Sequence, residues 1–315
     1  MKTQPIADTN LVTTRLAHGS HRLFVAGQPP KKPTRDDRDR GITACIAAFE
    51  SGYRLFDTAD VYGRGASEEI LGEALGLVES FRDNVIIATK CGIRHPGEPT
   101  SEAPQRYDFS EHHILMSCEG SLKRLGIDTI DIYQLHRPDV LCDPHEVSSA
   151  FDKLKQQGKV RCFGVSNFLP SQVAMLRQWL NLPIVANQVE IHLMRLACFE
   201  DGTLDQCIER DMLPLAWSPL AGGMLSDGNP VEPNHPRKPI LDQLHEKLGA
   251  MANGYGVSRT VISLAWLLKH PASIIPIVGS TNPDRIRDAA QAVDVELTRE
   301  QWYELYVVAR GKPMP

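Results

Sequence analysis

Four polar side chains lie where short apolar segments end, and their chemistry is complementary. Asp57 ends the segment YRLFD and Tyr62 follows five residues later, Lys90 ends NVIIATK, and His136 ends TIDIYQLH. Because an unpaired charge is costly to bury, ionisable groups at the ends of packed strands indicate one shared polar site. An acid, a phenol, an amine and an imidazole together are suited to moving a proton onto a carbonyl oxygen.

Each of the four residues has an expected role in carbonyl reduction. Tyr62 is the expected general acid, since a phenol keeps its proton near neutral pH. Lys90 is expected to lower the pKa of Tyr62, and Asp57 is expected to keep Lys90 charged and in position. His136 is expected to hydrogen-bond the substrate carbonyl and orient it. Any one of these residues alone is typical of a structural role, and their joint occurrence favours the catalytic one.

Eight short apolar segments alternate with helical patterns and predict the elements that position this site. The segments are 15–19, 53–57, 84–89, 130–135, 161–166, 184–188, 213–218 and 273–278. Several are almost wholly apolar, which is typical of parallel strands covered on both faces. The pattern predicts an α/β fold, a closed (β/α)8 TIM barrel, in which the ends of the strands converge on one face. An open doubly wound sheet is the alternative, but no first turn carries G-x-G-x-x-G.

The ends of the predicted helices and of the domain follow from local residues. Ser67, Ser110 and Ser258 are predicted N-caps, and Thr298 with Gln301 forms a predicted capping box. We expect one domain over residues 1–315, with an N-terminal extension at 1–13 and a C-terminal helix and tail at 298–315.

Composition excludes several classes of protein. The chain has 315 residues, a formal net charge of −5 and seven cysteines, none of which forms a C-x-x-C pair. The charge does not favour nucleic-acid binding, and no segment approaches 18 uninterrupted apolar residues. Reduced cysteines and an N-terminus without an apolar signal segment predict a cytoplasmic protein. A metal or a disulfide is not needed for stability at this length. The sequence does not set the oligomeric state, and a monomer is compatible with it.

Three of these segments also carry a resemblance to a known family. DTADVYG, the lysine after an apolar strand, and LHRPD resemble the signature of the aldo-keto reductases, and the resemblance extends from about residue 14 to 310. Its middle part, including LGIDTIDIYQLHRPD and GKVRCFGVSNF, is similar to a bacterial oxidoreductase branch. The resemblance implies an NADP-dependent reductase of small carbonyl substrates.

The resemblance also implies a set of cofactor-binding residues. GVSNF and NQVEIH match the segments that hold the nicotinamide amide, AWSPLAGG matches the segment that stacks on the nicotinamide and wraps the pyrophosphate, and IVGSTNPDRI matches the phosphate-binding turn. Arg285 stands where the family binds the 2′-phosphate, which favours NADP over NAD. The implied residues are Ser166, Asn167, Gln188, Trp217, Ser218, Pro219, Leu220, Gly222, Gly279, Ser280, Thr281 and Arg285.

The substrate pocket is expected to involve other segments. Residues 91–109 and 190–201 are expected to line it, and His21 or Arg22 is expected to favour a polar or acidic substrate. Residues 221–240 fit a lid over the cofactor and an ordinary flexible loop equally well. Two other functions stay open beside the reductase. One is a non-catalytic NADP(H)-binding regulatory or redox-sensing subunit, and the other is a metal-dependent hydrolase or isomerase.

Overall fold

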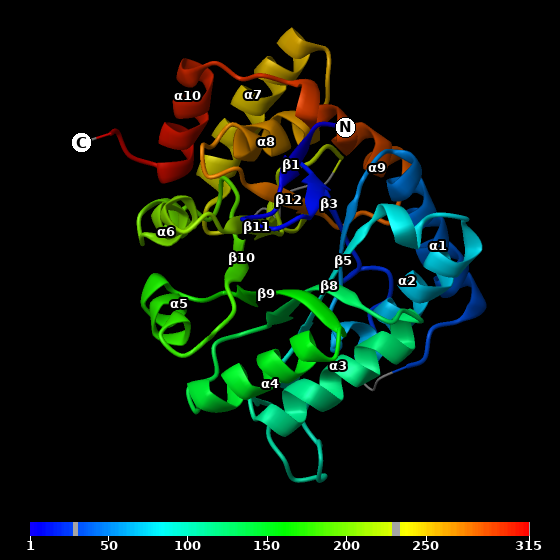
Figure 1. The fold of residues 1–315 in the computed structure, drawn as a ribbon. Helices are drawn as coiled ribbons and strands as arrows, with labels where there is room; N and C mark the ends of the chain where they lie inside the picture. Colours follow the sequence, from blue (N-terminus) through cyan, green and yellow to red (C-terminus); the bar gives the residue numbers. More distant parts are fainter. Residues whose placement is uncertain (28–30, 229–233, 315) are drawn as a thin grey trace.

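The protein forms a closed barrel of eight parallel strands surrounded by helices (Figure 1). The computed structural model describes residues 1–27, 31–228 and 234–314. Around the barrel the strands follow the order β10, β11, β12, β3, β4, β5, β8 and β9. Their bounds are β3 (Ala17–Gly19), β4 (Leu55–Asp57), β5 (Ile86–Cys91), β8 (Ile130–Leu135), β9 (Val160–Ser166), β10 (Ile184–Glu190), β11 (Leu213–Trp217) and β12 (Ile275–Val278). Each of the eight predicted segments overlaps one of these strands, although β5, β9 and β10 extend one or two residues beyond the predicted ends. The predicted (β/α)8 barrel is therefore confirmed and the open sheet is excluded.

The helices cover the outside of the barrel. Most of them come after a single strand of the barrel. Two helices, α7 and then α8, follow β11, and α10 packs against α7. Their bounds are α1 (Arg35–Glu50), α2 (Ala66–Leu77), α3 (Glu111–Leu125), α4 (Pro144–Gln156), α5 (Pro170–Arg177), α6 (Thr203–Glu209), α7 (Lys238–Tyr255), α8 (Arg259–Leu268), α9 (Pro283–Ala290) and α10 (Arg299–Arg310). All residues of β4, β5 and β8 are buried, because the helices cover one face of these strands and the barrel interior lies on the other.

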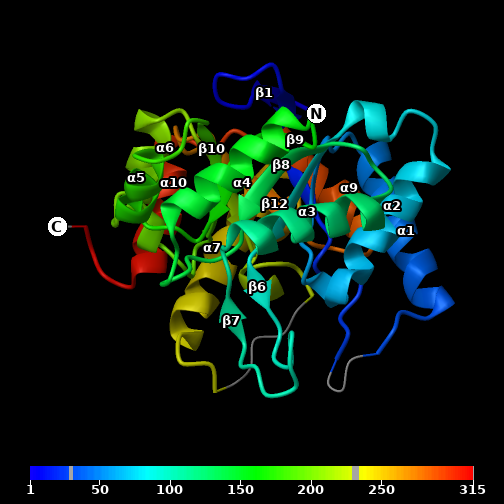
Figure 2. The same ribbon diagram turned by 60° about the horizontal axis from the view of Figure 1, so that its bottom comes forward.

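Two small hairpins lie at opposite ends of the barrel (Figure 2). At one end, β1 (Thr3–Pro5) pairs with β2 (Val12–Thr14) near the N-terminus. Ile6 and Leu11 between them are buried with the inward-facing residues of the barrel strands, so this hairpin closes the barrel interior. At the other end, β6 (Ile93–Arg94) pairs with β7 (Arg106–Tyr107) beyond the end of β5.

Three of the predicted helix caps are confirmed and one is wrong. Ser110 and Ser258 accept the predicted backbone hydrogen bonds, and Thr298 forms the capping box with Gln301. Ser67 instead lies inside the first turn of α2, which begins one residue earlier with Gly65 as its N-cap. Gly65 has a φ of 90°, and a Cβ there would approach the Arg124 side chain to 2.6 Å, so the backbone turns at a position that only glycine fits.

Candidate active site

The four predicted catalytic residues meet at the end of the barrel where the strands finish. Asp57 and Lys90 lie on the adjacent strands β4 and β5, and His136 directly follows β8, the next strand around the barrel. Tyr62 begins the short 3-10 helix η1 (Tyr62–Gly65) after β4. Because neighbouring parallel strands end at the same face, residues far apart in sequence come together there.

Lys90 is the centre of this cluster. Its Nζ lies 2.8 Å from Asp57 Oδ1 and 2.9 Å from Oδ2, and it donates to the Thr58 carbonyl at 2.7 Å. The same nitrogen donates to the Tyr62 hydroxyl at 3.3 Å. The rings of Tyr62 and His136 lie edge to face with centroids 5.6 Å apart. The Lys90 side chain is fully buried, so its charge depends on these protein partners and not on bulk water.

Burial and charge set the protonation of the cluster. Burial raises the pKa of Tyr62, and the Lys90 ammonium group, which lowers that pKa, offsets the rise only in part. The expected lowering by Lys90 is therefore present, but the expected net decrease is wrong, because removing the phenol from water has the larger effect. Burial would also lower the pKa of Lys90, yet the charge of Asp57 and the hydrogen bonds that Lys90 donates to Asp57 and Tyr62 outweigh it and raise that pKa.

The His136 imidazole is expected to be neutral at pH 7. Burial, followed by the positive charges of Lys90, Arg137 and His21, holds the pKa of His136 well below its usual value. Its Nδ1 atom is buried and has no hydrogen-bond partner among the residues that the structure describes. Because Nδ1 has no exposed surface, a hydrogen bond from His136 to a ligand in the cavity would come from Nε2, the other ring nitrogen.

Several residues implied as cofactor contacts form a hydrogen-bonded chain that reaches Asp57. Gln188 Nε2 donates to Asp57 Oδ1 at 2.7 Å, and Ser166 Oγ donates to the Gln188 carbonyl at 2.9 Å. Asn167 Nδ2 donates to Ser166 Oγ at 2.7 Å, while its Oδ1 accepts from Trp217 Nε1 at 2.9 Å. The chain fixes the plane of the Trp217 indole relative to the cluster around Lys90. The side-chain amide nitrogen of Gln188 is therefore already hydrogen-bonded to Asp57.

A cavity of about 800 Å³ opens next to this chain. Asp57, Tyr62 and His136 line it, whereas Lys90 lies behind them. The implied cofactor residues that line it are Ser166, Asn167, Gln188, Trp217, Ser218, Pro219, Leu220, Gly222, Gly279, Ser280 and Arg285. Thr281 does not line it, and the helix end beside it is capped internally, because Asn282 Oδ1 accepts from the amides of Asp284 and Arg285.

The expectations for the other pocket segments have different outcomes. Residues 91–109 do contribute to the cavity wall, through Ile93, His95, Pro96 and Gln105. Residues 190–201 do not line it, because Ile191 and Leu193 turn into the apolar core beside α7 and α8. Within 221–240, the segment from Gly222 to Asp227 contributes to the wall and α7 starts at Lys238, while residues 229–233 lie outside the described part of the chain.

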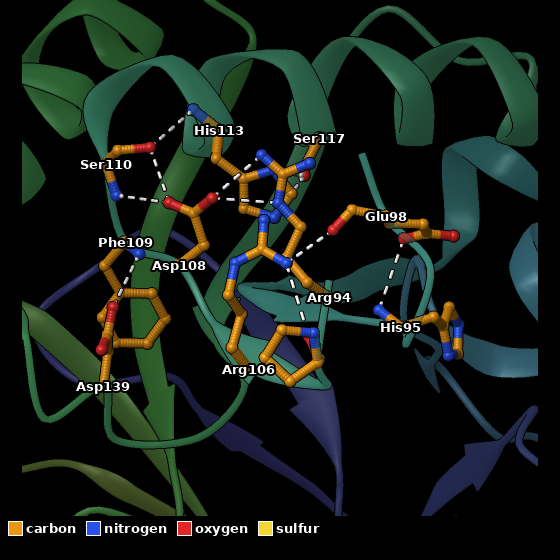
Figure 3. Close-up of polar contacts among 11 residues, drawn as sticks. Arg94, His95, Glu98, Arg106, Asp108, Phe109, Ser110, His113, Ser117 and Asp139 are labelled. Atoms are coloured by element: carbon orange, nitrogen blue, oxygen red, sulfur yellow. Dashed lines mark hydrogen bonds and ion pairs between the residues drawn. The ribbon is translucent and has the colours of Figure 1, made fainter. Parts of the chain in front are cut away.

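Polar contacts at its base hold the β6–β7 hairpin against neighbouring segments (Figure 3). Arg94 Nε donates to Asp108 Oδ2 at 2.9 Å, and Asp108 Oδ1 accepts from the Ser110 hydroxyl at 2.7 Å. The Phe109 amide donates to Asp139 Oδ2 at 3.0 Å. These contacts connect the hairpin to the start of α3 and to the loop that follows His136. The hairpin is therefore a fixed part of the cavity wall.

The sequence interpretation missed one residue beside the cluster around Lys90. Arg137 lines the cavity, and its Cζ atom lies 5.4 Å from the centroid of the Trp217 ring. The signal was present in LHRPD, where a cation directly follows the histidine. The described residues contain no group of three or more His, Cys, Asp or Glu side chains that could hold a metal ion. None of the helices in the described ranges is long and apolar enough to cross a membrane.

Comparison with known proteins agrees with this geometry. The model of the Aldo/keto reductase family matches residues 26–309. The chain is 36% identical over 316 residues to a 6-dehydroglucose reductase of Novosphingobium aromaticivorans, covering 98% of this chain and 96% of that protein. It is 37% identical over 270 residues to the oxidoreductase YdhF of Escherichia coli, covering 85% and 86%.

A solved structure is similar over the whole chain. The glycerol dehydrogenase AKR11B4 of Gluconobacter oxydans superposes with a TM-score of 0.84 at 27% identity, covering 99% of this chain and 97% of that one. Since the family model spans most of the chain and the relatives exceed 30% identity over nearly their full length, the protein belongs to the Aldo/keto reductase family.

Proposed function

We propose that the protein is an NADPH-dependent carbonyl reductase that converts aldehydes or ketones into alcohols, with Tyr62 as the general acid. The observation that carries the proposal is the Tyr62 hydroxyl on the cavity wall, 3.3 Å from the Lys90 ammonium group. A phenol that holds its proton at neutral pH, next to a cation that stabilises the phenolate, is suited to protonating an alkoxide.

The residues around the cavity fit a nicotinamide dinucleotide. Trp217 offers a flat ring, held by Asn167, on which a nicotinamide can stack. A Cβ added to Gly279 would meet no atom within 4 Å, so the backbone there is open to a close-lying group. Arg285 lines the same cavity, and a guanidinium group pairs well with a phosphate, which favours NADP over NAD. When bound, NADPH supplies the hydride that adds to the carbonyl carbon.

The protein's own residues handle orientation and the proton. The neutral imidazole of His136 donates a hydrogen bond to the substrate oxygen and holds the carbonyl beside Tyr62. The Tyr62 hydroxyl gives its proton to this oxygen, and Lys90 stabilises the phenolate that remains. Asp57 keeps Lys90 charged while both are out of water.

The test is NADPH oxidation by the purified protein with a panel of aldehydes, ketones and sugar carbonyls. The panel includes 6-dehydroglucose, because a relative that is 36% identical carries that substrate in its name. Tyr62→Phe should lower kcat about 100- to 10,000-fold, the usual contribution of a general acid, and should retain NADPH binding. Tyr303→Phe, which alters an exposed tyrosine on α10, is the matched control.

The result also separates the reductase from its alternative. Turnover that Tyr62→Phe removes without loss of NADPH binding supports the reductase. Tight NADPH binding with no turnover of any carbonyl would instead support a regulatory or redox-sensing subunit. Full activity of Tyr62→Phe would show that another group supplies the proton.

A further inference from the structure

Four guanidinium groups line the cavity, and two of them are already engaged. Arg22 donates to the Gly222 carbonyl at 3.3 Å, and Arg64 pairs with Glu98 on the β6–β7 hairpin at 3.2 Å. Arg137 and Arg285 have no hydrogen bond or ion pair from their side chains to any described residue. The cavity therefore carries two guanidinium groups that are available to a ligand.

These two arginines lie on opposite sides of the barrel. Arg285 is on α9, which follows β12, and Arg137 follows β8. Three strands separate β12 from β8 in each direction around the closed sheet. Arg285 is the proposed partner of the cofactor phosphate, so it does not explain Arg137. Arg137 is next to His136, on the side of the cavity where the carbonyl is proposed to react.

The carboxylates near Arg137 are bound elsewhere. Asp139, two residues along the chain, accepts hydrogen bonds from the amides of Phe109 and Leu141. Among the acidic residues that line the cavity, Asp57 is bound by Lys90 and Gln188, Asp227 by Arg259, and Asp288 by the Ser258 hydroxyl. The Arg137 guanidinium lies over the Trp217 ring, with 5.4 Å between Cζ and the ring centroid.

The positive charge of Arg137 affects the pKa values of His136 and Tyr62. It contributes to holding the pKa of His136 below its usual value, after burial and Lys90. It also acts on Tyr62, where it opposes the pKa rise that burial causes. His136 and Arg137 are consecutive residues, with Cα atoms about 3.8 Å apart. A ligand group bound by Arg137 would therefore lie close to the carbonyl that His136 binds, which favours a short substrate molecule.

We propose that Arg137 binds a carboxylate carried by the substrate, so that the preferred substrates are short carbonyl acids such as semialdehydes and uronic acids. A carboxylate accepts two parallel hydrogen bonds from a guanidinium group, a stronger interaction than a hydroxyl group offers. The proposal rests on the proposed reductase function and adds its substrate class. It also moves the expected acid preference from Arg22, which is bound to Gly222, to Arg137.

The carboxylate takes no part in the chemical step. Bound NADPH would supply the hydride for the new C–H bond, and the Tyr62 hydroxyl would give its proton to the carbonyl oxygen, which receives the π electrons. The products would be an alcohol and NADP+, with the carboxylate unchanged. Arg137 is therefore a specificity residue, and its effect should appear mainly in KM and in the choice between substrates.

The experiment compares pairs of substrates in which a neutral ester or amide replaces the carboxylate. The pairs are succinic semialdehyde with its methyl ester, and D-glucuronate with D-glucuronamide, measured as kcat/KM with NADPH. Wild-type protein should prefer each acid, and Arg137→Met should lower kcat/KM for the acids about 10- to 100-fold while changing the neutral partners less than about threefold. Arg137→Lys should fall between them, since it keeps the charge but loses the paired geometry.

Arg64→Gln is the matched control, because it removes the same charge from the same cavity but from a guanidinium group that Glu98 already binds. It should leave the ratio of acid to neutral kcat/KM unchanged. An equal loss in Arg64→Gln and Arg137→Met would overturn the proposal in favour of a general charge effect. Turnover of the neutral partners with no preference for the acids would overturn it and leave the reductase intact. No turnover of any member by the wild type would overturn the proposal, and it would contradict the reductase itself only if the wider carbonyl panel also gave no turnover.

Discussion

Removing one partner of the Asp57–Lys90 ion pair should cost more stability than replacing both partners together. Lys90 is fully buried and Asp57 is 3% exposed, so a single replacement leaves the other charge in the interior without its counterion. We consider Asp57→Asn, Lys90→Met and the double variant. Each replacement is close in shape to the original side chain, which limits the contribution of lost packing.

The expected size follows from the contact distance. At 2.8 Å between Lys90 Nζ and Asp57 Oδ1, the Coulomb attraction is about 6 kcal/mol with an effective dielectric constant of ~20. The cost of keeping both ions out of water cancels much of it. Breaking a buried pair from one side typically costs about 3–5 kcal/mol, whereas replacing both ions is close to neutral. If each single change costs about 3 kcal/mol and the double change almost nothing, the coupling energy of the pair is about 6 kcal/mol.

The assay is urea unfolding at pH 7.5, followed by tryptophan fluorescence and circular dichroism. Coincidence of the two signals would support two-state analysis. The exposed pair Lys247–Glu304, with 2.7 Å between Nζ and Oε1, is the control and should show little or no coupling. Additive losses from Asp57→Asn and Lys90→Met would refute the reasoning, because they would mean that the two buried charges do not depend on each other.

Two further predictions concern the cofactor and the pH dependence of stability. Arg285→Gln should raise the Kd for NADPH about 10- to 100-fold and leave the Kd for NADH nearly unchanged, as measured by fluorescence titration; an equal effect on both cofactors would contradict a 2′-phosphate contact. His18 is buried without a hydrogen-bond partner in the described structure, and burial lowers its pKa to about 4. In the unfolded chain its pKa is about 6.5, so the unfolded state takes up the proton first and stability is lost as the pH falls from 6.5 towards 4. His18→Phe should therefore reduce the loss of unfolding free energy between pH 7 and pH 5 by about 2 kcal/mol, and an unchanged pH dependence would exclude this role for His18.

Much of the barrel and of the catalytic cluster is readable from local sequence. Strands that are buried on both faces are rich in apolar residues, so the sequence predicts strands at YRLFD and IDIYQL. Asp57 and His136, at the ends of these segments, predict the polar site. Helix caps such as Ser110 depend on neighbours three residues away, which the sequence also contains. Ser67 failed as a cap because the turn before it is determined by Gly65 and by its contact with Arg124, which is distant in sequence.

The sequence alone determined which chemical groups the site contains and the alternation of strands and helices that brings them to one end of a barrel. Only the tertiary structure decided how those groups act on one another. Whether Tyr62 has a raised or a lowered pKa depends on the balance between its burial and the charge of Lys90, and burial is a property of the whole fold. Likewise, Arg22 and Arg137 look equivalent as sequence letters. They differ because one reaches the Gly222 carbonyl and the other has no such partner among the described residues, and such contacts between distant segments are set by packing in three dimensions.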